Sequence, residues 1–394
     1  MAASAPAALA DAAPVAAGPS IAMVAGETSG DLLAGLLLDG LRTRWPGLRT
    51  GGIGGTQMAR RGFDAWWPSD KLAVRGYAEV LRHYREITGI RDSLRGRLLG
   101  RRPDVFVGVD APDFNLALER DLKRQGIKTV QFVCPSVWAW RASRLARIRA
   151  SADHVLCLFP FEPELLHRHG IAATYVGHPL AAVIPMQPDK SAARRALGMS
   201  EADTVVALLP GSRRSEIQYL ARRFLDAARV LKRERPALRF VLPAIPALES
   251  TIRQAAADAS MAADVTILTG QSYLALAACD VSLVASGTAT LEAALFKRPM
   301  VIAYNMHWLT WLIMRPKQLQ PWVGLPNILC REFVVPELMQ HRATPAAMAA
   351  ALGGWLDAPE RIAAVQRRFE ALHADLSRDT SRLATDAIAH LLAS

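Results

Sequence analysis

Short apolar runs, each followed by a small polar loop and then by a helix-like stretch, recur along the chain. Residues 21–25 form the first run and lead through a loop at 26–31 into a leucine-rich segment. A second run at 104–110 precedes a predicted helix near 113–125, and a third occupies 128–133. Buried strands that alternate with crossover helices predict a parallel sheet, whose ligands bind beyond the carboxyl ends of its strands.

The same order of elements begins again after a proline-containing segment at 177–188. Strands are predicted at 205–209, 281–285 and 300–304, and the first two lead through short loops into helices. From about residue 359 the pattern is helical to the end of the chain. With 394 residues the chain exceeds the roughly 250–300 residues at which a single core stops growing, so two α/β domains are expected.

These patterns divide the chain into four parts. The Ala-rich stretch at 1–19 contains no Lys or Arg, so it lacks the basic start of a secretory signal and is predicted to be a disordered tail. The first α/β domain is placed at 20–184 and the second at 185–365, with a helical segment at 366–394.

The charge balance favours anionic partners. Lys and Arg number 47 against 36 Asp and Glu, a net charge of +11 that attracts nucleic acids, anionic lipids or sugar nucleotides. Eight arginines lie within residues 75–102 and form a basic patch. No stretch reaches the roughly 18 uninterrupted apolar residues that span a bilayer, so a soluble or surface-bound protein is expected. The four cysteines form no C-x-x-C pair and the histidines are scattered, so no metal site is predicted.

A first phosphate-binding candidate lies at residues 210–214, between an apolar strand and a predicted helix. The loop combines Gly211, the Ser212 hydroxyl and the Arg213 guanidinium with a helix N-terminus, and together these groups suit a diphosphate. A plain connection between strand and helix is the alternative, because Gly-Ser turns are common.

A second loop of the same kind follows the strand at 281–285 and contains Ser286, Gly287 and Thr288. The i, i+4 spacing puts Thr288 and Glu292 on one helix face, where the carboxylate can accept hydrogen bonds from ribose hydroxyls. A capped helix start with a solvated Glu292 is the alternative. Two such loops in one domain favour a nucleotide site.

Carboxylates after the apolar runs of the first domain are candidates for acid–base chemistry. Asp110 ends the run at 104–110, and a carboxylate at that place can act as a general base toward a sugar hydroxyl. Asp113 is better placed to cap the following helix. Glu27 is a similar candidate for the base, although its loop also has the composition of a helix start.

The basic patch also carries an apolar stripe at helical intervals. The stripe contains Tyr77, Val80, Leu81 and Tyr84, with Arg82 and Arg85 beside it. This pattern suits a helix that lies on anionic lipid. An ordinary helix that packs on the sheet with its basic face in water is the alternative.

Six strings, taken together and in order, resemble the bacterial lipid A disaccharide synthase family. They are Ala25–Asp31, Asp104–Asn115, Pro135–Arg141, Leu209–Arg213, Ala285–Glu292 and Leu325–Asn327. Any one string is weak by itself, but their order makes the resemblance specific. It covers the chain from about residue 20 to the C-terminus.

The resemblance implies the α/β fold called GT-B, which has two Rossmann-like domains, an acceptor site in the first, a sugar-nucleotide site in the second and catalysis in the cleft between them. A C-terminal helix is expected to pack back on the N-terminal domain. The implied reaction is an inverting condensation of UDP-2,3-diacylglucosamine with 2,3-diacylglucosamine 1-phosphate, which gives a β-1,6-linked disaccharide 1-phosphate and UDP. The resemblance also implies no metal or other cofactor, a place at the cytoplasmic face of the inner membrane, and Glu27 and Asn327 as cleft residues.

The chemistry of the candidate residues agrees with this reaction. An inverting displacement needs a base on the incoming hydroxyl, for which Asp110 is the first candidate and Glu27 the second. Loop amides, an arginine and helix N-termini can stabilise the departing diphosphate without magnesium. The predicted donor-site residues are Gly211, Ser212, Arg213, Ser286, Gly287, Thr288, Glu292 and Asn327.

Two other enzyme classes share the expected fold and UDP site, namely UDP-N-acetylglucosamine 2-epimerases and the lipid II glycosyltransferase. The six ordered strings weigh against both. A nucleic-acid-binding module would explain the charge, but no RRM, zinc-finger or KH signature appears, so nucleic acid is not an expected partner. Exposed apolar surface makes a homodimer a reasonable further expectation.

Overall fold

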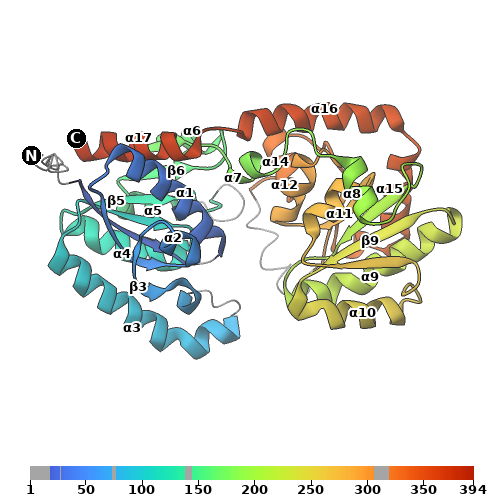
Figure 1. Ribbon diagram of the computed structural model, residues 1–394, viewed down its shortest axis with the longest axis horizontal. Helices are drawn as coiled ribbons and strands as arrows, with labels where there is room; N and C mark the ends of the chain where they lie inside the picture. The colour runs from blue at the N-terminus through green and yellow to red at the C-terminus, as the bar shows by residue number, and fades with distance from the viewer. Residues whose placement is uncertain (1–17, 27, 73–76, 138–143, 306–318) are drawn as a thin grey trace, which may run out of the picture. The chain divides into compact units, whose positions relative to one another are not determined.

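The computed structural model describes residues 18–26, 28–72, 77–137, 144–305 and 319–394. These residues form two compact units. The N-terminal unit contains the described residues up to Pro135, then Arg144–Val176 and Asp379–Ser394, and the C-terminal unit centres on Gly177–Arg378. Each unit is a parallel sheet with helices on its faces (Figure 1).

The N-terminal unit has a seven-stranded sheet of order β3-β2-β1-β4-β5-β6-β7. All its strand pairs are parallel. Its strands are β1 (Ser20–Ala25), β2 (Arg49–Gly54), β3 (Asp64–Pro68), β4 (Val105–Val109), β5 (Lys128–Phe132), β6 (His154–Cys157) and β7 (Ala173–Tyr175). Its α-helices are α1 (Thr28–Arg44), α2 (Thr56–Ala59), α3 (Tyr77–Arg101), α4 (Pro112–Arg124), α5 (Arg144–Ser151), α6 (Glu162–His167) and α17 (Thr380–Ala393).

Successive residues of β1 point to opposite faces of the sheet and so join two different cores. Ile21 and Met23 face a cluster that includes residues of α1 and the completely buried Ile388 of α17. Ala22 and Val24 face a second cluster, built with residues of α3 and α4. Figure 1 shows the red C-terminal helix α17 beside the blue α1. The expectation that a C-terminal helix packs on the N-terminal domain is therefore confirmed.

The C-terminal unit has a six-stranded sheet of order β10-β9-β8-β11-β12-β13, also parallel throughout. Its strands are β8 (Val205–Leu209), β9 (Arg239–Ala244), β10 (Val265–Thr269), β11 (Val281–Ala285), β12 (Met300–Tyr304) and β13 (Glu337–Met339). Its α-helices are α7 (Pro179–Val183), α8 (Lys190–Ala196), α9 (Arg214–Glu234), α10 (Glu249–Asp258), α11 (Ser272–Ala278), α12 (Thr288–Leu295), α14 (Leu325–Cys330), α15 (Pro345–Leu356) and α16 (Pro359–Leu376).

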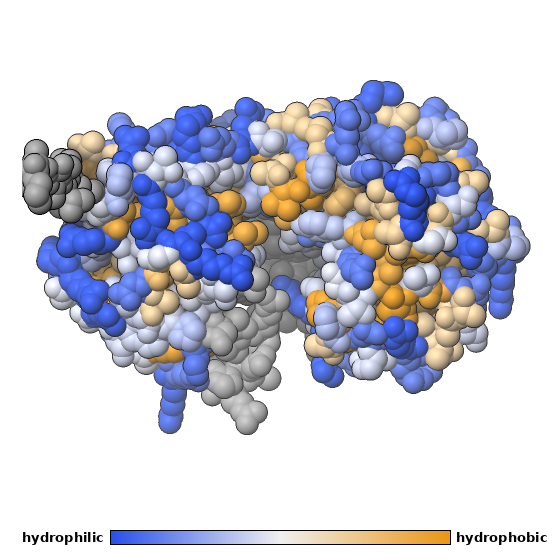
Figure 2. Space-filling view, in the orientation of Figure 1, coloured by the Kyte–Doolittle hydropathy of each residue, from blue (hydrophilic) through white to orange (hydrophobic). Residues whose placement is uncertain are grey.

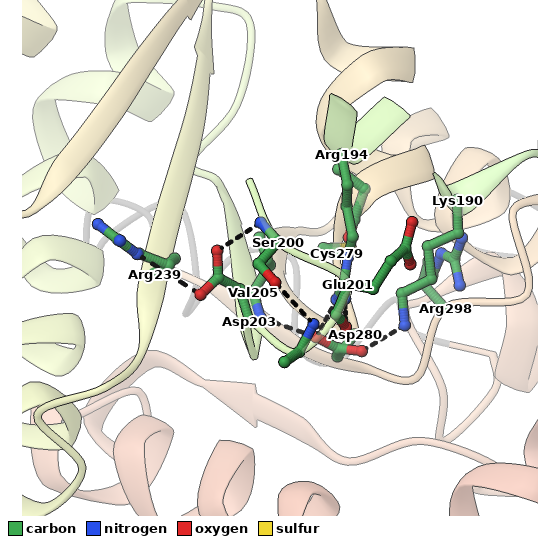
Figure 3. Close-up of polar contacts among 12 residues, drawn as sticks. Lys190, Arg194, Ser200, Glu201, Asp203, Val205, Arg239, Cys279, Asp280 and Arg298 are labelled. Carbon is green, nitrogen blue, oxygen red and sulfur yellow. Dashed lines mark hydrogen bonds and ion pairs between the residues drawn. The ribbon is translucent and has the colours of Figure 1, made fainter. Parts of the chain in front are cut away.

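A charged network braces the amino ends of β8 and β11 (Figure 3). The Asp280 carboxylate accepts hydrogen bonds from Arg194 Nη2 and from the Val205 N–H, each at 2.7 Å, and pairs with Lys190. The Arg194 side chain is almost completely buried, so its charge needs this partner. The network fixes one end of the two strands and leaves their carboxyl ends for a ligand site.

The division into units differs from the predicted parts of the chain. The chain enters the C-terminal unit at Gly177, ahead of the boundary predicted between 184 and 185. Helix α7 belongs with α16, because the His178 N–H donates to the Leu376 carbonyl and the His373 ring contacts the Ala181 carbonyl. The helical segment predicted at 366–394 is divided between the two units, with α16 in the C-terminal unit and α17 in the N-terminal unit. The predicted tail lies almost wholly outside the described residues.

Candidate active site

A pocket of about 480 Å³ lies at the carboxyl ends of the strands of the C-terminal unit. Its lining includes the loops that follow β8, β9, β10 and β11, together with the end of β12. The strand order reverses direction between β8 and β11, and such a switch point is where open α/β sheets bind ligands. The volume falls within the roughly 300–1,000 Å³ that small-molecule sites occupy.

The loop after β8 is held in shape by Glu216 of α9. Glu216 Oε2 accepts the N–H groups of Ser212 at 2.9 Å and Arg213 at 3.2 Å, which is the reciprocal half of a capping box. Gly211 has φ +119°, and a β-carbon there would lie 2.6 Å from Glu216 Cβ. Only glycine fits this position. Two of the loop amides that were expected to face phosphate are therefore bound by Glu216 instead, and the loop offers the Arg213 guanidinium as a cationic group.

The loop after β11 places the start of α12 at the pocket. Its helix N-cap is Gly287, with φ +147° and no side chain to cap the first turn. The Thr290 N–H donates to the Gly287 carbonyl at 3.1 Å, whereas the N–H groups of Thr288 and Ala289, at the very start of the helix and at the pocket, suit an anion. Ser286 and Thr288 also line the pocket, and the Ser286 hydroxyl donates to the Val323 carbonyl at 3.3 Å.

Two ionisable side chains with raised pKa values also line the pocket. Glu292, one helical turn after Thr288, is partly buried, and burial raises the pKa of its carboxyl. Tyr304 ends β12, and burial together with the nearby Glu216 raises the pKa of its phenol. The predicted residues Gly211, Ser212, Arg213, Ser286, Gly287, Thr288 and Glu292 therefore come together at one pocket.

Asn327, the remaining predicted donor-site residue, does not line this pocket. Its side chain is completely buried and is absent from the pocket lining. Its amide nitrogen donates to the Val335 carbonyl at 2.9 Å and to Glu337 Oε1 at 2.8 Å, while its oxygen accepts the Val335 N–H at 3.0 Å. Glu337 in turn accepts the Gly324 N–H. These bonds make Asn327 a structural clamp between α14 and the strand β13.

Asp110 lies at the switch point of the N-terminal sheet, between β1 and β4. It has φ +53° and is followed by Ala111 with φ +41°, so the chain leaves β4 through two left-handed residues. A β-carbon at Gly26 would lie 3.1 Å from Ala111 Cβ, which puts the loop after β1 against the loop after β4. Glu27 itself lies outside the described residues.

Asp113 has a different role from the predicted helix cap. The N-cap of α4 is Ala111, and no side chain caps the helix. Asp113 is exposed and pairs instead with Arg144 at 2.9 Å. Pro112 at the first helical position explains the difference, since its fixed φ starts the helix without a capping side chain.

The basic helix is only partly described. The side chains of Tyr77, Val80, Leu81, Arg82 and Tyr84 lie outside the description, although α3 itself begins at Tyr77. In the described part Arg85 is exposed, whereas the apolar stripe continues through Leu94 and Leu98 into the core. The second half of α3 therefore packs on the sheet.

Sequence reasoning missed several pocket residues. The largest omission is Glu216, although its place three residues after Arg213 has the spacing of a capping box. Tyr304 gave no signal beyond its position at the end of an apolar run. The other omissions lie in the loops after β9 and β10, where no phosphate-like pattern drew attention to them, and include Ile245, Pro246, Gly270, Gln271 and Ser272.

Comparison with known proteins gives the family. A family model described as lipid-A-disaccharide synthetase matches residues 21–390. The chain belongs to the lipid-A-disaccharide synthase family. It is 66% identical over 377 residues to the lipid-A-disaccharide synthase of Albidiferax ferrireducens, covering 94% of this chain and 97% of that protein. It is 63% identical to the enzyme of that name from Verminephrobacter eiseniae, covering 95% of this chain and 97% of that one.

Solved structures support the fold. A Staphylococcus aureus protein named MnaA, determined with UDP, has a TM-score of 0.63 at 11% identity, covering 94% of this chain and 95% of that one. The UDP-GlcNAc 2-epimerase of Neisseria meningitidis has a TM-score of 0.62 at 14% identity, covering 95% of this chain and 99% of that one. At these identities the likeness shows the fold alone, and the predicted GT-B fold is confirmed.

Family membership also decides between the enzyme classes that share this fold. The chain is a glycosyltransferase of lipid A biosynthesis rather than an epimerase. The family reaction condenses UDP-2,3-diacylglucosamine with 2,3-diacylglucosamine 1-phosphate and releases UDP. The remaining question is which residues of this chain carry out each part of that reaction.

Proposed function

We propose that the pocket of the C-terminal unit holds the UDP part of the donor, and that Asp110 is the base for the acceptor. The observation that carries the proposal is the convergence at one pocket of an uncapped helix start, an exposed arginine and a carboxylate. The first-turn amides of α12 suit the diphosphate, and Arg213 adds positive charge beside it. The Glu292 carboxylate accepts hydrogen bonds from the ribose hydroxyls.

In the proposed step, the acceptor 6-hydroxyl attacks the anomeric carbon of the donor. The new glycosidic C–O bond forms as the bond to the UDP oxygen breaks, so the configuration inverts. Asp110 takes the hydroxyl proton, and UDP leaves with the electron pair. Amides, Arg213 and the helix N-terminus stabilise the charge that develops on the diphosphate, so the proposal includes no metal.

Glu292→Gln tests the nucleotide part of the proposal. Hydrogen bonds to a charged group contribute about 1.5–3 kcal/mol, so the substitution is expected to weaken UDP binding by roughly 10- to 100-fold. Burial raises the pKa of Glu292. The Glu292 carboxylate is therefore protonated at a higher pH than an ordinary glutamate as the pH falls. UDP affinity should decrease toward acidic pH more steeply in the wild type than in the variant. UDP's own titration is common to both proteins.

Calorimetry with UDP in the presence of EDTA measures both effects. Glu249→Gln is a matched control, because Glu249 is a carboxylate of the same unit that does not line the pocket. The control should bind UDP as the wild type does. Equal UDP affinity of Glu292→Gln and the wild type across the pH range would rule out the assigned ribose contact, and loss of binding in EDTA would rule out a metal-free site.

We also place the enzyme at the cytoplasmic face of the inner membrane, where both acylated substrates reside. No described helix has the length and apolar character needed to cross a bilayer. Hydrophilic residues cover much of the N-terminal unit in the view of Figure 2, with apolar residues in scattered patches. The support for a membrane contact is therefore the arginine-rich sequence at 75–102 and the first turns of α3. The homodimer stays a prediction.

Polar replacement of the first turns of α3 tests this placement. The changes replace Tyr77, Val80, Leu81 and Tyr84 by serine. Loss of the apolar stripe is expected to reduce binding to vesicles of anionic lipid by about tenfold or more, while UDP affinity stays unchanged. Tyr219→Ser, on an exposed aromatic of α9, is the control and should bind vesicles normally. Vesicle co-sedimentation that is unaltered by the fourfold change would contradict the placement.

A further inference from the structure

A buried polar cluster lies beneath the Asp110 turn in the N-terminal unit. Its members are Asn115 and Glu119 of α4 and Gln131 of β5, and each side chain is completely buried. Three polar side chains of this kind are costly in a core unless their hydrogen-bonding groups are satisfied. The family reaction and the proposed base leave this cluster without a role.

The three side chains meet above Gly108 of β4. A β-carbon at Gly108 would lie 2.9 Å from Asn115 Cγ, and even closer to a carboxylate oxygen of Glu119. Gly108 pairs in register with Gln131, whose side chain therefore projects on the same face of the sheet. The missing side chain at position 108 provides the space in which the carboxyl and the two amides lie together.

Two members of the cluster hold the backbone of the proposed base. Asn115 Nδ2 donates to the Asp110 carbonyl at 2.9 Å, and Gln131 Nε2 donates to the same oxygen at 3.2 Å. Asp110 has φ +53°, a conformation that costs a non-glycine residue about 1–3 kcal/mol and persists only where its surroundings impose it. The two amide N–H groups are the contacts that hold this turn from below.

The other ends of these side chains present only acceptors. Asn115 Oδ1, Gln131 Oε1 and both carboxyl oxygens of Glu119 are buried without a hydrogen-bond partner among the described residues. Amide oxygens and an ionised carboxylate cannot donate to one another. One O–H is therefore needed within the cluster, and a neutral Glu119 supplies it.

The surroundings of Glu119 favour that neutral form. Burial raises the pKa of Glu119 to about 8. The charge of Asp153 acts in the same direction, whereas Arg147 and Lys123 act against it and are too weak to restore an ordinary value. At neutral pH the side chain is a carboxylic acid with one proton to donate.

We propose that Glu119, as the neutral acid, donates its O–H to the amide oxygen of Asn115 or Gln131 and so keeps the N–H of that amide on the Asp110 carbonyl. A side-chain amide can rotate by a half-turn about its terminal bond, which exchanges its oxygen and its NH2 group. A donor placed beside the oxygen therefore keeps the NH2 group directed at the Asp110 carbonyl. Glu119 is then a positioning residue for the base. This inference rests on the proposed role of Asp110.

The test compares Glu119→Gln with Glu119→Leu in the full-length enzyme. Glutamine keeps a neutral donor at every pH, so kcat at pH 7 should stay within about threefold of the wild type; leucine removes the donor, and kcat should fall by roughly tenfold or more. The KM for the donor should change little in both variants. Glu162→Gln, at another buried carboxyl of the same unit, is the matched control and should not alter the pH profile.

The pH profile separates positioning from a merely structural role. Wild-type kcat should decline as the pH rises past about 8, where Glu119 loses its proton, and this alkaline decline should be absent in Glu119→Gln. Infrared spectra of protein with isotope-labelled glutamate should contain a buried carboxylic acid band at pH 7. That band should disappear above about pH 8 and be missing from Glu119→Gln.

The outcomes also distinguish this inference from the proposed base. A fully active Asp110→Asn would overturn the base while leaving the infrared result for Glu119 to stand. An inactive Asp110→Asn, combined with an unchanged alkaline decline in Glu119→Gln, would overturn the positioning role alone. Absence of the acid band at pH 7 would do the same. Thermal unfolding reports whether Glu119→Leu is folded, and Glu119→Gln keeps the test decisive if it is not.

Discussion

Asp110→Asn is expected to lower kcat by about 10²- to 10⁴-fold, the usual contribution of a general base. Asparagine keeps the shape of the side chain but cannot take a proton at neutral pH. The substitution keeps the backbone contacts of the turn, since Asn115 and Gln131 donate to the Asp110 carbonyl and the Asp110 N–H donates to the Phe132 carbonyl. The variant should therefore fold normally and bind UDP with wild-type affinity.

A radiolabelled-donor assay with saturating acceptor measures this effect, with thermal unfolding as the check on folding. Asp113→Asn is the matched control. Asp113 lies in the first turn of α4 as an exposed carboxylate paired with Arg144, and a pair of this kind contributes only about 0–1 kcal/mol. The control should retain activity within about threefold. Near-normal turnover by Asp110→Asn would show that another group is the base, and Glu27→Gln would then be the next variant to measure.

Gly211→Ala is expected to weaken UDP binding by roughly 5- to 150-fold. Its φ of +119° is a conformation that side chains rarely adopt, and the new β-carbon would lie 2.6 Å from Glu216 Cβ. The loop or the start of α9 must shift, and strain of about 1–3 kcal/mol converts to a loss of roughly 5- to 150-fold when binding needs the original loop. KM for the donor should rise correspondingly.

Gly198→Ala is the matched control for this prediction. Gly198 also has a positive φ, +65°, in the same unit, but a β-carbon there meets nothing within 4 Å. The control should lose about 1 kcal/mol of stability and bind UDP normally, which isolates the steric effect at the pocket. If Gly211→Ala and Gly198→Ala bound UDP equally well, the loop after β8 would not be part of the nucleotide site.

Changes at Glu119 should also alter how stability depends on pH. The acid is ionised in the unfolded chain above about pH 4.5, whereas in the folded unit its pKa is raised to about 8. Between these values unfolding releases a proton, so this group's contribution to stability is complete below about pH 4.5 and is lost as the pH rises to about 8. Glu119→Gln should remove that loss, and denaturant unfolding at pH 5 and pH 8 measures it.

Local sequence was sufficient for the elements and for most of the pocket. The run at 205–209 coincides with β8 and the run at 281–285 with β11, because an apolar run followed by a glycine-containing loop is recorded entirely in neighbouring residues. The loops after these strands were identifiable for the same reason. In a parallel sheet all carboxyl ends lie at one edge, so finding the loops was enough to bring Arg213 and Glu292 to one pocket.

The tertiary structure decided which polar groups bind one another. The Leu325–Asn327 string singled out Asn327, but only the fold shows its amide bound to Val335 and Glu337 from a later strand. Glu216 of α9 accepts amides of the preceding loop, and Glu119 lies against Gly108, the register partner of Gln131, only because α4 packs on β4. Hydrogen-bond partners depend on distances across the fold, whereas a sequence pattern reports only the periodicity of burial. The sequence alone therefore determined the strands, the loops and the family resemblance, and the packed structure determined what each buried polar side chain does.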